Sequence, residues 1–77
     1  MFDFSQLPRP LHEYSTAAII PISGSSWYVV LEYRSPSGVV LLDTRSVAIA
    51  DRQDRALMLR DELIKTLRAA RALVGKA

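Results

Sequence analysis

The chain is 77 residues long, which suits one domain with one hydrophobic core. It contains no cysteine, so disulfides and thiolate metal sites are excluded. Its formal charge of +2, from 10 Lys and Arg against 8 Asp and Glu, gives only weak general attraction to nucleic acid or acidic lipid. The hydrophobic fraction of 49% is high for so short a chain and favours a folded domain that associates with another surface.

The N-terminal region predicts neither export nor a membrane span. The opening Met-Phe-Asp-Phe has no basic start and no continuous apolar run, so we expect a cytoplasmic protein. Residues 14–31 carry no charged side chain, but Pro21 and Gly24 interrupt them, and no membrane contact is predicted. Residues 1–15 include Pro8 and Pro10, which remove backbone donors and predict an irregular N-terminal arm.

Residues 16–50 are predicted to form an antiparallel β-meander of three or four strands. Isoleucine-rich residues 17–22 form the first strand. Because Pro21 lacks an N–H, this strand either lies at the sheet edge or breaks at Pro21. Aromatic and β-branched residues make 27–34 the clearest strand. Turn-forming Ser, Pro and Gly then lead into a strand at residues 39–42. Residues 43–45 form a bulge or a turn, and residues 46–50 either continue that strand or form a fourth.

A long helix is predicted over residues 51–75. Asp51 is a suitable N-cap, and Gly75 is a suitable stop. Apolar residues recur at helical spacing along one face: Ala56, Leu59, Leu63, Leu67, Ala70 and Val74, with Leu57 and Ile64 beside them. The sequence therefore predicts a single α+β domain, in which one C-terminal helix packs on one face of the sheet.

The second face of the predicted sheet is apolar too. Alternation along residues 27–34 places Tyr28 and Val30 on one face of the sheet and Trp27 and Val29 on the other. One helix covers only one of these faces. Either the N-terminal arm covers the second face, through Phe2, Phe4, Leu7 and Leu11, or a second subunit or another protein does. We expect the second of these, with the following partner-binding residues: Tyr28, Val30, Arg34, Val40 and Leu42.

Catalysis is not predicted. His12 is the single histidine and lies in the proline-flanked arm. A Ser-His-Asp set can be written with Ser15, His12 and Asp3, but no nucleophile turn or oxyanion glycine accompanies it. The acidic residues suit helix caps and ion pairs better than metal ligation, so we expect no metal and no cofactor.

Nucleic-acid binding is the competing hypothesis. A tryptophan opens the clearest strand (Ser26-Trp27-Tyr28-Val29), a hairpin turns at Gly38, and a helix enters through residues 51–56. This order is similar to the arm-binding domains of phage-type integrases, whose three-stranded sheet lies in a DNA major groove. The resemblance implies a basic sheet face, whereas the face here carries Arg34 and at most Arg45. The candidate nucleic-acid-binding residues are Arg34, Arg45, Arg60, Arg68 and Arg71.

The basic residues concentrate in the helix, since residues 51–77 hold seven basic and four acidic residues and residues 1–50 hold three and four. The compact, arginine-rich domain is also similar to small phage or mobile-element proteins that block or redirect a host protein. Our prediction is a non-catalytic protein-interaction module that forms a homodimer or acts as an adaptor or stoichiometric inhibitor of a partner protein.

Overall fold

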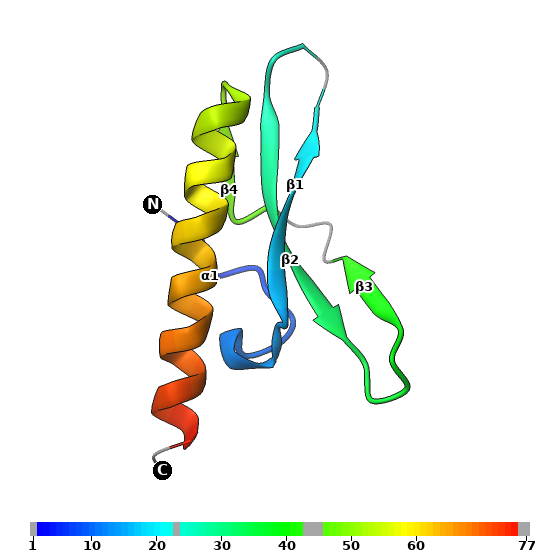
Figure 1. Ribbon diagram of the computed structural model, residues 1–77. Helices are drawn as coiled ribbons and strands as arrows, with labels where there is room; N and C mark the ends of the chain where they lie inside the picture. Colours follow the sequence, from blue (N-terminus) through cyan, green and yellow to red (C-terminus); the bar gives the residue numbers. More distant parts are fainter. Residues whose placement is uncertain (1, 23, 43–45, 76–77) are drawn as a thin grey trace.

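The computed structural model describes residues 2–22, 24–42 and 46–75. Its elements are a 3₁₀ turn η1 (Leu11–Glu13), strands β1 (Thr16–Pro21), β2 (Trp27–Arg34), β3 (Val40–Leu42) and β4 (Ala48–Ala50), and helix α1 (Gln53–Gly75). Figure 1 shows α1 lying along one side of an antiparallel sheet. The predicted α+β class is confirmed, and so is the long C-terminal helix.

Strand β2 is the centre of the sheet. It pairs with β1 along residues 27–32, with β3 along residues 32–34 and with β4 along residues 27–29, always antiparallel. Because Glu32 pairs with both Thr16 and Leu42, β1 and β3 occupy opposite edges of β2. The β1 strand ends at Pro21 and pairs with β2 alone, as the missing N–H of proline predicts.

The last two strands lie end to end on one edge of β2. Five residues separate Leu42 from Ala48, while only two separate their partners Glu32 and Val29, so the register changes between β3 and β4. Residues 46–50 therefore include a short fourth strand in line with the third. The predicted bulge or turn at residues 43–45 lies outside the described residues.

The hairpin between β2 and β3 is closed by a tight turn. The Ser35 N–H donates to the Val39 carbonyl and the Gly38 N–H donates to the Ser35 carbonyl, each at 2.9 Å. Gly38 has φ +90°, a backbone conformation in which any residue with a side chain would be strained. Hydrogen-bonded pairs alternate in an antiparallel ladder, so Tyr33 and Leu41 form the next bonded pair. The backbone N–H and C=O groups of Val40 and Leu42 consequently point away from β2.

One core lies between the sheet and α1. Its buried residues come from both layers and from the loops: Tyr14, Ala17, Val29, Leu31, Val47, Leu63 and Leu67. The arm packs against this same cluster through Phe2, Phe4, Leu7 and Leu11, and the Asp3 N–H donates to the Val47 carbonyl at 2.9 Å. The interpretation in which the arm covers the second sheet face is therefore wrong, because its apolar anchors are used on the helix side.

Helix α1 begins later than its sequence predicts. The first helical hydrogen bond runs from the Ala56 N–H to the Arg52 carbonyl at 3.1 Å, so Asp51 precedes the helix and is not its N-cap. Ala56, Leu63 and Leu67 are fully buried as the stripe predicts. Val74 is 49% exposed, because the last turns of α1 run past the end of β1 (Figure 1).

Candidate functional site

The sheet face turned away from α1 is the candidate site. Residues directly opposite each other in an antiparallel ladder point to the same face, so the register assigns every strand residue to one side. We call the side without the helix the open face. Its members are Thr16, Ala18, Ile20, Tyr28, Val30, Glu32, Arg34, Val40, Leu42 and Ile49.

The open face exposes apolar side chains at both of its ends. Val40 and Leu42 are each 47% exposed at the hairpin end, and Ile49 is 63% exposed at the other end. Tyr28 and Ile20 are half-buried between their neighbours. Exposed aliphatic side chains that share one sheet face mark interaction surfaces more often than scattered ones do.

All five residues predicted to bind a partner share the open face, but they do not share the same accessibility. Tyr28, Arg34, Val40 and Leu42 are at least partly exposed. Val30 points to the same face but has no exposed surface within a single chain, so it cannot itself touch a partner. Sequence reasoning missed Ile49, because its place on this face depends on the changed register of β4.

Two cross-strand pairs of the open face lie symmetrically about Val30. Tyr28 lies two residues before Val30 on β2 and has Ile49 as its partner on β4. Glu32 lies two residues after Val30 and has Leu42 as its partner on β3. At equal distances from Val30 the open face therefore has one exposed apolar side chain beside one polar group, a phenol on one side and a carboxylate on the other. Val40 and Arg34 lie farther out at the hairpin end and have no counterpart.

The candidate nucleic-acid-binding arginines do not gather on one side of the molecule. Arg34 lies on the open face, whereas Arg60, Arg68 and Arg71 belong to α1 on the opposite side of the sheet. Arg60 pairs with Asp61 at 3.1 Å, and Arg71 donates to the Ser15 carbonyl at 3.1 Å. Arg45 lies outside the described residues. The described arginines thus form no continuous basic surface on the sheet.

Two of the polar residues considered for catalysis, Ser15 and Asp3, have structural partners. The Ser15 hydroxyl donates to the Glu32 carbonyl at 3.0 Å. The Asp3 carboxylate accepts the Ser5 hydroxyl at 2.6 Å and the Ser5 N–H at 3.0 Å, and these bonds hold the pKa of Asp3 below its usual value. Among residues 2–22, 24–42 and 46–75, no three His, Cys, Asp or Glu side chains lie close enough together to bind a metal ion. The described helices include none that is long and apolar enough to span a membrane.

Comparison with protein-family models, with curated proteins and with solved structures finds no match to this chain.

Proposed function

We propose that this protein is a non-catalytic protein-interaction module that works as a homodimer joined through its open face. The observation that carries the proposal is the exposure of Val40, Leu42 and Ile49 on a sheet face that neither α1 nor the arm covers. Burial of apolar surface is the main favourable contribution to association, and each exposed aliphatic side chain contributes about 1 kcal/mol or more when it is buried.

The symmetry of the open face supports a second copy as the occupant. When two such faces pack about a two-fold axis that crosses the strands at Val30, β2 of one copy runs antiparallel over β2 of its partner. Residues at equal distances from Val30 then meet: Ile49 packs on Leu42, and Tyr28 lies over Glu32. Both exposed apolar ends are buried together, once on each side of the axis.

The polar groups agree with the same arrangement. The Tyr28 hydroxyl is a donor and the Glu32 carboxylate is an acceptor, so each copy supplies what the other needs. A half-buried carboxylate that enters an interface requires such a donor, because its desolvation without one costs several kcal/mol. In the homodimer, the adaptor or inhibitor role belongs to surfaces outside the open face.

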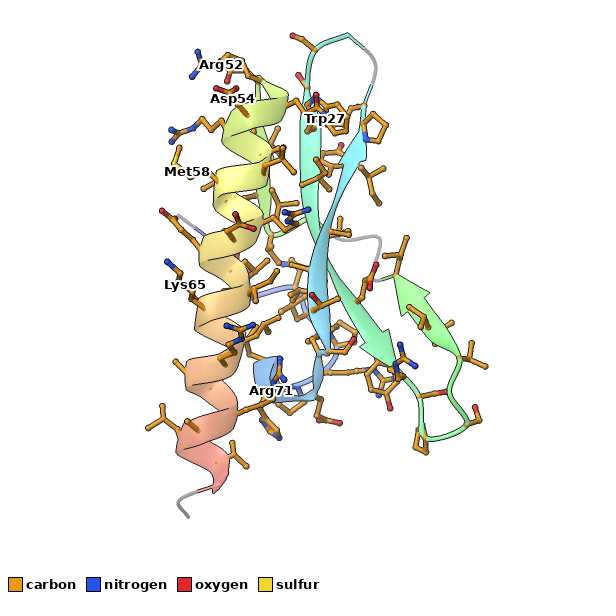
Figure 2. The ribbon with its side chains drawn as sticks, viewed as in Figure 1. Trp27, Arg52, Asp54, Met58, Lys65 and Arg71 are labelled. Atoms are coloured by element: carbon orange, nitrogen blue, oxygen red, sulfur yellow. The ribbon has the colours of Figure 1, made fainter. Side chains whose placement is uncertain are left out.

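Light scattering across a dilution series tests this function. We expect the parent protein to have the mass of a dimer that dissociates on dilution, and Tyr28→Glu and Ile49→Glu to be folded monomers by circular dichroism. Met58→Glu is the matched control, because Met58 is 54% exposed and projects from α1 away from the sheet (Figure 2). A parent that is monomeric at every concentration, or glutamate variants that stay dimeric, would refute the proposal.

A further inference from the structure

The outer edge of β3 carries backbone groups that have no partner among residues 2–22, 24–42 and 46–75. In the order β1-β2-β3, β3 is the terminal strand and hydrogen bonds to β2 on one side only. The bond from the Ser35 N–H to the Val39 carbonyl shows which pairs of the β2–β3 ladder are hydrogen-bonded. Val40 and Leu42 belong to the other pairs, so their N–H and C=O groups point outward, away from β2. Such a row is a template for one more strand.

Side chains on both sides of this edge are exposed and apolar. Val40 and Leu42 are each 47% exposed on the open face. Val39 and Leu41, which point to the helix side, are 53% and 49% exposed, because α1 packs on β1, β2 and β4. Residues 39–42 contain no charge and no proline, the features by which proteins usually protect an edge strand. An added strand would therefore find apolar neighbours on both of its faces.

Two arginines lie beside β3, one on each side of the sheet. Arg34 is directly opposite Val40 on the open face and is exposed. On the helix side, the Arg9 guanidinium lies 3.8 Å from the ring centre of Tyr33, which is opposite Leu41. The ion pairs of the described residues, Arg52 with Asp54 and Arg60 with Asp61, involve neither arginine. The turn end of β3 is therefore positive on both faces.

We infer that the outer edge of β3 binds an extended apolar segment of another protein, which adds to the sheet as a strand and places an acidic residue beside Val40. The charge selects an acidic segment as the occupant, whereas a second copy would add another Arg34 to the paired sheet. The inference goes beyond the homodimer, since it uses the strand edge and leaves the open face to the second copy.

Two hexapeptides test the inference: EVTVTV, which has the acid, and KVTVTV, which replaces it with a base. Binding is followed by the amide NMR signals of the full chain at millimolar peptide. We expect EVTVTV to slow hydrogen exchange at the Val40 and Leu42 amides specifically, and KVTVTV to bind several-fold more weakly. Arg34→Gln should reduce the ratio of the two peptides' affinities by roughly two- to fivefold.

Matched variants separate the edge from the open face. Val40→Pro removes the outward N–H and should weaken EVTVTV binding by about fivefold or more, whereas Val40→Thr keeps that N–H and should bind like the parent. Tyr28→Glu should still bind EVTVTV, so the peptide result does not depend on the dimer. The inference is overturned if EVTVTV leaves the Val40 and Leu42 amides unchanged, or if both peptides bind equally.

Discussion

Ile49 lies directly opposite Tyr28 in the ladder between β4 and β2, on the side of the sheet that α1 does not cover. The pair has a counterpart in Leu42 opposite Glu32, on the other side of Val30. The two pairs give the open face a two-fold pattern of apolar and polar groups. That pattern is the physical reason for choosing a second copy of the chain as the partner.

Two valines on the open face should respond very differently to truncation. Val30 has no exposed surface and Val40 is 47% exposed, although both point to the same side. In the Tyr28→Glu background, where dimerisation is removed, we expect Val30→Ala to lower the free energy of unfolding by about 2–3 kcal/mol and Val40→Ala by at most about 0.5 kcal/mol. Urea unfolding measures both losses, and equal losses would mean that Val30 is not buried in the folded monomer.

The Tyr28 hydroxyl should matter for association and not for folding. Tyr28→Phe keeps the ring but removes the donor for Glu32 of the second copy. The two-fold dimer loses two such bonds, so its dissociation constant should rise by roughly a hundredfold, about tenfold for each bond to a charged group. The unfolding free energy of the monomer should stay unchanged. Sedimentation equilibrium gives the constant, and an unaltered value would disprove the contact between Tyr28 and Glu32.

Much of the fold could be predicted from the sequence, because local signals agree over long segments. The helical stripe through Leu63 and Leu67 and the aromatic strand at residues 27–34 identify both layers. The sequence predicts the helix start two residues too early, since a suitable cap residue such as Asp51 does not by itself decide where the first hydrogen bond forms.

The site was less accessible to sequence reasoning. Alternation along β2 correctly placed Tyr28, Val30 and Arg34 on one face, because period two is a property of a single strand. The place of Ile49 depends on how β4 pairs with β2, and the arm could have covered either face. Pairing and docking are long-range choices that no local pattern encodes.

The arm offers a test by pH. Two hydrogen bonds from Ser5 stabilise the Asp3 carboxylate and lower its pKa. The bond from the Ser5 hydroxyl has the larger effect, and the bond from its backbone N–H has the smaller one. Because folding lowers this pKa, the Asp3 carboxylate stabilises the folded state at pH values above its pKa in the unfolded chain. This stabilisation is lost as the pH falls through the pKa in the folded state. We expect Ser5→Ala to raise the pKa of Asp3, measured by NMR titration of its carboxyl carbon. A pKa that stays the same in the variant would show that the hydroxyl is not the cause.

The most direct test of the homodimer is an isotope-filtered NOE experiment on a mixture of labelled and unlabelled chains. The proposed two-fold arrangement predicts contacts between the Ile49 side chain of one copy and the Leu42 side chain of the other, together with contacts from the Tyr28 ring. Intermolecular contacts confined to Leu73 and Val74, which are 72% and 49% exposed at the end of α1, would contradict the account, as would their complete absence.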